Sequence, residues 1–329
     1  MLRRLALAGT ALVAAVLALA ATALAGGASP GLVQGSRGVT LPGQPLRYVT
    51  FGSGETTAVA AVIKGSGTIA RWRPFAGQWG IPAVTFDGAA DGLTRDGRTL
   101  VLADWTQPEN SALRSVSQFR LLDTRTFLPK QTIELKGDFS FDAFSPNGNT
   151  LYLIQHVSEQ DVMRYLVRAF DLNAQRLLPK IVADRRQADW VMRGFPMKRA
   201  TSADGRWVYT LYRQDGGYPF VHALDAANRT AVCIGVPWTG SQDPLAGAEL
   251  RLDERHGKLT ISAAARQVAI DTQTFRVSIP KPGGDGFPSG LVAGLAAGVF
   301  VLTALVTLTL LARRRNRARL NPPIEGLPA

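Results

Sequence analysis

Short apolar runs separated by turn residues fill the middle of this chain. Runs at 59–63, 151–154 and 207–211 are rich in Val, Leu, Ile and aromatic residues, and Gly, Pro, Asn and Asp lie between such runs. No stretch between residues 46 and 280 places apolar residues at the spacing of an amphipathic helix. The pattern predicts an all-β domain over residues 46–280.

A strand–turn–strand motif recurs in this domain. Its copies span 93–101, 144–152, 201–209 and, more loosely, 252–260, with turn glycines 51, 57 and 52 residues apart. The glycine predicts a tight turn with positive φ, a conformation that glycine adopts at little cost.

A second landmark, an Asp at the end of a third strand, follows each copy. This Asp can accept hydrogen bonds from the backbone of the next turn. The four residues are Asp123, Asp171, Asp225 and Asp271. Fourth strands are expected at 131–135, 180–183, 231–236 and 275–279.

Four strands in each unit of roughly 50 residues are typical of a β-propeller blade. Residues 46–84 lack both landmarks but contain a predicted hairpin through 65–67, so they form a further candidate blade. We therefore expect a β-propeller of about five four-stranded blades.

The segment 144–152, FSPNGNTLY, resembles the F-S-P-D-G-x-x-L-Y element of WD40-like propeller repeats. Such repeats occur in bacterial exported propellers of the TolB and YVTN types. The similarity covers residues 85–280, and the first and last units depart from the pattern. It implies a propeller fold, and because those families include scaffolds, ligand binders and some enzymes, it implies little about chemistry.

The N-terminus has the pattern of a secretory signal peptide. Arg3 and Arg4 precede an apolar core at 5–21, and Ala23-Leu24-Ala25 matches an A-x-A cleavage site. We interpret residues 1–25 as a signal peptide and 26–45 as a linker. The alternative for 1–25 is an uncleaved anchor helix with the same orientation.

A second apolar segment predicts a membrane anchor near the C-terminus. Residues 290–312 are 23 uncharged residues, enough for a helix to cross a hydrocarbon core of ~30 Å. A linker at 281–289 precedes this segment, and a basic tail at 313–329 follows it. The tail's arginines favour retention in the cytoplasm and can bind anionic lipid headgroups. They are Arg313, Arg314, Arg315, Arg317 and Arg319. A single-pass protein of the cell membrane, with an extracytoplasmic propeller and a cytoplasmic C-terminus, is expected.

Small residues recur at four-residue spacing within this segment, at Gly290, Gly294 and Gly298. They would let two helices approach closely, which makes this face a candidate homodimer interface. The other interpretation is the ordinary Gly and Ala content of an apolar segment.

Charge and cysteine content narrow the function classes. The net charge is +12, and the two tails contribute +6 of it. The rest of the chain is therefore a weakly basic globule, and no nucleic-acid partner is expected. Cys233 is the only cysteine, so no internal disulfide can form. A buried thiol and an intermolecular disulfide are the two readings of this residue.

Motifs for catalysis and for metal or cofactor binding are absent from the sequence. The three histidines fit no metal-ligand spacing, and no nucleophile elbow, phosphate loop or dinucleotide fingerprint occurs. No catalytic residue, metal or cofactor is predicted. Carboxylates that gather across blades would leave no local spacing, so a glycosidase-like pair stays open.

Two places could bind a partner. The long, unequal loops should share one rim of the propeller, where rigid frames usually carry function. There we predict Trp105, Glu109, Trp190, Arg193, Trp238 and Asp243 as binding residues. The alternative is that the tryptophans fill gaps between blades and the charges are solvated.

The second place is the central channel. Asp91, Asp142, Arg199 and, less clearly, Arg251 stand six residues before the turn glycines, on the innermost strands. Opposite charges there can pair structurally or hold a polar ligand.

The sequence favours a membrane-anchored binding or interaction module that takes an unknown protein or glycan partner. A propeller hydrolase, lactonase- or glycosidase-like, with carboxylates near the channel mouth is the alternative. A structural or sensory subunit of a membrane complex is a third reading.

Overall fold

The computed structural model describes residues 38–280 apart from residues 54, 107–110 and 187–190. The predicted signal peptide, the predicted membrane segment with its glycine face, the arginine tail, Glu109 and Trp190 lie outside the described residues. Among the described residues, no helix is long and apolar enough to cross a membrane.

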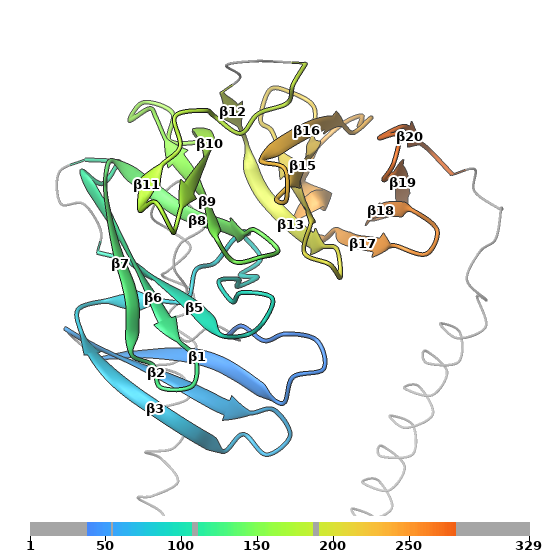
Figure 1. The fold of residues 1–329 in the computed structure, drawn as a ribbon. Helices are drawn as coiled ribbons and strands as arrows, with labels where there is room; N and C mark the ends of the chain where they lie inside the picture. The colour runs from blue at the N-terminus through green and yellow to red at the C-terminus, as the bar shows by residue number, and fades with distance from the viewer. Residues whose placement is uncertain (1–37, 54, 107–110, 187–190, 281–329) are drawn as a thin grey trace, which may run out of the picture. The chain divides into compact units, whose positions relative to one another are not determined.

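Five antiparallel sheets, which follow one another in chain order, make up the described chain (Figure 1). The first sheet contains β1 (Leu46–Ser53), β2 (Thr56–Ile63) and β3 (Ile69–Ala76). The second contains β4 (Trp79–Gly80), β5 (Thr99–Asp104), β6 (Val116–Asp123) and β7 (Pro129–Lys136). This confirms the all-β prediction and the hairpin between β2 and β3.

The remaining three sheets repeat the four-strand order. The third contains β8 (Asp138–Phe144), β9 (Thr150–His156), β10 (Arg164–Asp171) and β11 (Arg176–Leu177), and β12 (Met192–Arg193) also pairs with β10. The fourth contains β13 (Phe195–Thr201), β14 (Trp207–Arg213), β15 (Phe220–Asp225) and β16 (Thr230–Gly235). The fifth contains β17 (Glu249–Asp253), β18 (Lys258–Ala263), β19 (Arg266–Asp271) and β20 (Val277–Ser278). A short 3-10 helix, Asp243–Gly247, precedes the fifth sheet.

The sheets differ from the predicted blades at their outer and first strands. The fourth strand of the third sheet was predicted at 180–183, but β11 lies at Arg176–Leu177. Beyond β11, only single backbone hydrogen bonds continue the pairing with β10, such as the bond from the Val182 N–H to the Val167 carbonyl. The first sheet has three strands, and Val39 adds a bridge to Tyr48. An isolated bridge thus precedes β1, within the segment interpreted as a linker.

Four hydrophobic clusters join neighbouring sheets. The first and second sheets share a cluster that contains Val59 and Leu100, and the second and third share one that contains Phe119 and Leu153. Two further clusters join the third sheet to the fourth and the fourth to the fifth. Among the described residues, no such cluster joins the fifth sheet to the first, so ring closure stays a prediction.

Both repeated turns have the predicted geometry. Gly97, Gly148, Gly205 and Gly257 have φ of +69°, +71°, +72° and +59°. At the second turn, one carboxylate oxygen of each landmark Asp accepts the backbone N–H groups two and three residues later. The residue four positions after each Asp also has positive φ, and none of these residues is glycine: Phe127, Gln175, Arg229 and Phe275.

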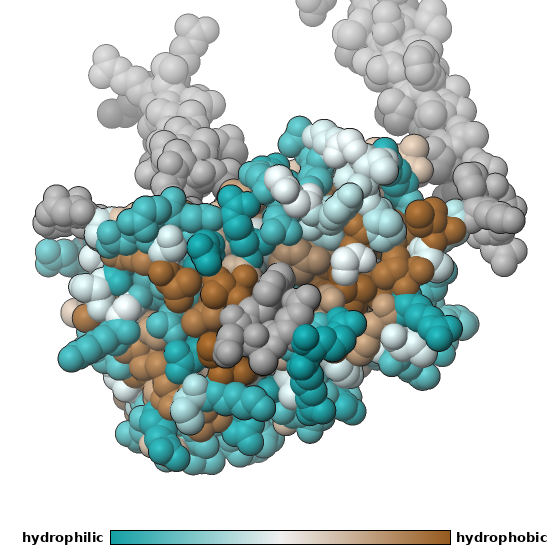
Figure 2. Space-filling model, turned by 90° about the horizontal axis from the view of Figure 1, so that it is seen from above, coloured by the Kyte–Doolittle hydropathy of each residue, from teal (hydrophilic) through white to brown (hydrophobic). Residues whose placement is uncertain are grey.

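Hydrophobic side chains also gather on parts of the surface. Figure 2 shows them across the middle of one face, with hydrophilic side chains around them. Large apolar side chains that are exposed include Phe51, Ile69 and Trp72 of the first sheet and Tyr218 in the loop between β14 and β15.

Candidate functional site

Three of the four predicted channel residues meet between sheets. Arg199 of β13 donates through its guanidinium to a carboxylate oxygen and to the backbone carbonyl of Asp142 in β8, and through Nε to the Thr210 hydroxyl (3.2 Å). Its Nη1 lies 3.9 Å from a carboxylate oxygen of Asp91. The side chains of Arg199 and Asp142 are only 7% and 5% exposed, so this pair is part of the interior.

Asp91 is the most exposed of the three, although it is still largely buried. Its side chain is 32% exposed, and one of its oxygens accepts the N–H of Gly92 at 2.6 Å. Burial raises the pKa of Asp91 above its ordinary value, and the neighbouring Asp142 charge adds to this, although Arg199 opposes it. Arg251 lies on the fifth sheet and makes no ion pair with these residues among the described contacts.

A cavity of about 540 Å³ adjoins two of these residues. Asp91 and Arg199 line it, together with the Thr40–Gln44 side of the N-terminal segment and the turns that begin at Ser145 and Ser202. Its volume lies within the usual range of small-molecule sites. Ser145 and Ser202 carry no signal of a site in the sequence, because they belong to the stereotyped turns rather than the variable loops.

Hydrogen bonds brace the turns that line the cavity. In each turn, the hydroxyl at the first position donates to a side-chain oxygen two residues later and accepts a backbone N–H five residues later. The side-chain oxygen belongs to Asn147 in the Ser145 turn and to Asp204 in the Ser202 turn. Arg95 Nε also donates to the carbonyl of Ala203 at 3.1 Å, which links the second and fourth sheets. These hydrogen bonds therefore define the geometry of the turns that line the cavity.

The loop rim has a different character. Arg193 donates to the carboxylate of Asp161 at 2.6 Å and to the Asp215 carbonyl at 2.8 Å, and Arg213 lies 3.4 Å from Asp243. Arg193 and Asp243 thus belong to neighbouring exposed charge pairs.

The two described tryptophans of the predicted rim differ in exposure. Trp238 is 6% exposed, its indole N–H donates to the Ser241 carbonyl, and Arg266 stacks over its ring. Its surface is therefore occupied within the fold. Trp105 is half-buried.

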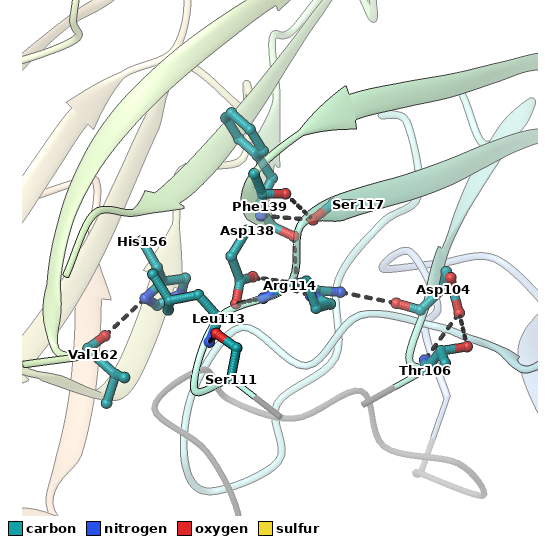
Figure 3. A network of polar contacts seen from close by, with 11 residues as sticks. Asp104, Thr106, Ser111, Leu113, Arg114, Ser117, Asp138, Phe139, His156 and Val162 are labelled. Carbon is teal, nitrogen blue, oxygen red and sulfur yellow. Dashed lines mark hydrogen bonds and ion pairs between the residues drawn. The ribbon is translucent and has the colours of Figure 1, made fainter. Parts of the chain in front are cut away.

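A network that the sequence did not indicate ties the second and third sheets together at the loop ends (Figure 3). Arg114 donates to the Asp138 carboxylate at 2.7 Å, to the Phe139 carbonyl at 2.6 Å and to the Asp104 carbonyl at 3.0 Å. Asp138 is buried and pairs in register with His156. These contacts pair the Arg114 guanidinium with the Asp138 carboxylate and with backbone carbonyls, which favours a structural role for both residues.

Reactive side chains are held in unreactive states. Burial lowers the pKa of His222 to about 4, and burial also lowers the pKa of His156. Burial raises the pKa of the Cys233 thiol to about 12, so its thiolate is scarce at neutral pH. Among the described residues, no group of three or more His, Cys, Asp and Glu side chains could hold a metal ion.

Comparison with family models and with curated proteins finds no match. Solved structures of similar fold include a putative TolB from Agrobacterium tumefaciens (13% identity, 70% of this chain and 76% of that chain, TM-score 0.40). The Dos1 propeller is another (10% identity, 71% and 56%, TM-score 0.42). A puromycin-hydrolyzing peptidase of Mycobacterium tuberculosis is a third (17% identity, 74% and 38%, TM-score 0.40). These likenesses concern the fold alone.

Proposed function

We propose that this chain is a membrane-anchored, extracytoplasmic propeller that acts as a non-enzymatic binding module. The observation that supports the proposal most is the cavity that Asp91 and Arg199 line. Arg199 is already engaged by Asp142, whereas the Asp91 side chain is 32% exposed and can meet a partner. A carboxylate accepts hydrogen bonds from hydroxyl, amide and ammonium groups, which suits a glycan or the polar end of a protein segment.

The environment of the buried charged and titratable groups also favours binding over catalysis. The Asp142 carboxylate forms an ion pair with Arg199, and burial lowers the pKa of His156 and of His222, which keeps both side chains neutral at neutral pH. A general base needs a free, suitably placed lone pair and a pKa near the working pH.

Membrane anchoring rests on the sequence. The uncharged segment 290–312 and the arginines after it favour a single crossing with the C-terminus in the cytoplasm. We further propose that the glycine face at 290, 294 and 298 supports a homodimer. Gly294→Ile should then weaken self-association of the full chain in a membrane association assay, and unchanged association would remove this face as the interface.

The binding proposal is tested with the full chain in lipid nanodiscs. Wild type, Asp91→Asn and Asp243→Asn are compared on a glycan array and against candidate proteins identified by proximity labelling at the cell surface. We expect saturable binding that Asp91→Asn abolishes and Asp243→Asn retains. Loss of binding in Asp243→Asn alone would instead place the partner on the loop rim.

A hydrolase is the second candidate, and one observation favours it. Burial raises the pKa of Asp91, which lies near a second carboxylate, Asp142, and a carboxyl group with a raised pKa suits a general acid. Turnover of a lactone, ester or glycoside panel by the wild type, lost in Asp91→Asn, would support the hydrolase and overturn the binding module.

A further inference from the structure

On one face of the first sheet, the two central cross-strand rows are apolar. The strand registers place Val49, Ala60 and Trp72 in one cross-strand row and Phe51, Ala58 and Pro74 in the next. Arg47, Val62 and Ile69 form a third row. We call this surface the outer face of the first sheet.

The opposite face of the same sheet already packs against its neighbour. Tyr48, Val59 and Ala61 join the cluster shared with the second sheet. On the outer face, by contrast, Val49, Ala60 and Val62 form a cluster that contains only residues of the first sheet itself. Among the described residues, therefore, no second sheet covers the outer face.

The large side chains on the outer face reach solvent. Trp72 is 62% exposed, and Phe51 and Ile69 are about half exposed. An exposed apolar patch of this kind usually marks an interaction site.

The fifth sheet is a poor partner for this face, although it is the sheet that a closed ring would bring next to the first. Its cluster-facing residues pack on the fourth sheet. Its other face presents polar cross-strand rows, one of Glu249, Ser262 and Gln267 and one that begins with Arg251 and Thr260. If the apolar outer face packed against these rows, their polar groups would lose hydrogen bonds to water and gain none in return.

Two basic side chains adjoin the outer face, whereas Arg71 and Arg73 pair in register with Ala61 and Val59 on the opposite face. Glu55, the one acid of residues 46–76, lies between β1 and β2. Lys64 is exposed at the turn between β2 and β3, and Arg47 lies on the outer face. Tryptophan beside Arg and Lys is the composition that favours the interface between headgroups and acyl chains.

We propose that the outer face of the first sheet docks onto the anionic surface of a lipid bilayer, with Trp72 and Phe51 inserted at headgroup depth. The proposal rests on the proposed membrane anchor. A linker of nine residues, 281–289, can span only about 30 Å, so the domain stays within reach of the bilayer. Docking would orient the cavity relative to the membrane plane.

Site-directed fluorescence on the full chain tests this. In a Cys233→Ala background, Trp72→Cys carries an environment-sensitive fluorophore, and Tyr218→Cys, another highly exposed aromatic position, is the matched control. The chain is reconstituted in vesicles of phosphatidylcholine and phosphatidylglycerol whose acyl chains carry nitroxide. We expect a blue shift and strong quenching at position 72 and no change at position 218. Vesicles of phosphatidylcholine alone should reduce the quenching.

Two further readouts separate the outcomes. Flotation of the vesicles reports the anchor itself: a chain that floats without quenching at position 72 overturns the docking and leaves the anchor intact, whereas a chain that does not float overturns both. Phe51→Cys repeats the measurement at a second site in case the first variant misfolds. Disulfide cross-linking between Trp72→Cys chains in detergent, without quenching in vesicles, would assign the face to a second copy instead.

Discussion

At the scale of the residue, the most regular feature is the turn that follows each landmark Asp. The carboxylate organises the backbone, and the chain then passes through a positive φ at a non-glycine residue. A left-handed conformation costs a non-glycine residue roughly 1–2 kcal/mol. In each of the four turns, the hydrogen bonds to the Asp carboxylate stabilise the fold, whereas the positive φ at the non-glycine residue destabilises it locally.

Relief of this cost should be measurable at Arg229, which is exposed and has φ of +56°. Glycine at this position removes the steric cost of the positive φ but adds conformational entropy to the unfolded state. We therefore expect Arg229→Gly to raise the free energy of unfolding by about 0.5–1 kcal/mol. Thermal unfolding should show a melting temperature higher by about 1–4 °C. Ala227→Gly in the same turn is the control and should not raise it; a fall for Arg229→Gly would contradict the argument.

The buried histidine His222 should make stability depend on pH. Burial lowers its pKa to about 4, with Asp142 and Asp184 opposing and Arg199 adding to this, whereas the unfolded side chain titrates near 6.5. Between these values the unfolded state binds the extra proton, so the free energy of unfolding falls as the pH falls through this window.

Replacement of His222 should flatten this dependence. Between pH 6.5 and pH 4, the titration of His222 should lower the free energy of unfolding by on the order of 3 kcal/mol. We expect His222→Gln to remove this decrease, as measured by urea unfolding at several pH values. His256→Gln, at an exposed turn, is the control. An unchanged slope in His222→Gln would show that other groups dominate.

At the scale of the element, the interfaces between sheets decide which strands stay together. Between the third and fourth sheets, Tyr152 donates through its hydroxyl to the Ala226 carbonyl at 2.7 Å, and Tyr165 packs against Tyr212. Arg199 and Asp142 add an ion pair in the same interface. A charge buried there is costly unless its partner is present.

Arg199→Ala should therefore destabilise the fold by about 3–5 kcal/mol, because Asp142 would be left buried and unpaired. The double variant Arg199→Met with Asp142→Leu should recover part of this loss. Chemical denaturation measures both. Arg193→Ala, which breaks an exposed pair with Asp161, is the control and should change stability little. A loss no greater than that of the control would refute a structural role for the buried pair.

At the scale of the whole molecule, the described sheets and the apolar segments at the ends of the chain raise separate questions. The sheets place a cavity and an apolar outer face on one body. The segment 290–312 and its arginines predict how that body is held at a membrane.

The topology can be tested in intact cells that express the full chain. In a Cys233→Ala background, a membrane-impermeant thiol reagent should label Ser289→Cys from outside. Leu320→Cys should be labelled only after permeabilisation, because the basic flank stays inside. Labelling of Leu320→Cys in intact cells would reverse the topology.

The sequence by itself determined the strands, the turn glycines and the Asp caps, because these depend on residues within about five positions of one another. The Gly148 turn and the Asp225 cap are examples, and both were predicted with their geometry. Short or irregular strands were predicted less well: β11 is displaced from 180–183, since tertiary hydrogen bonds decide how far an outer strand extends.

Only the tertiary structure decided which distant residues meet. Arg199 and Asp142 are 57 positions apart, and their spacing from the turn glycines indicated a shared channel in which opposite charges can pair, but not which carboxylate Arg199 binds. The Arg114 network, the turn-lined cavity and the uncovered face of the first sheet left no local signal. Such features arise from contacts across sheets, and neither periodicity nor motif spacing along the chain records those contacts.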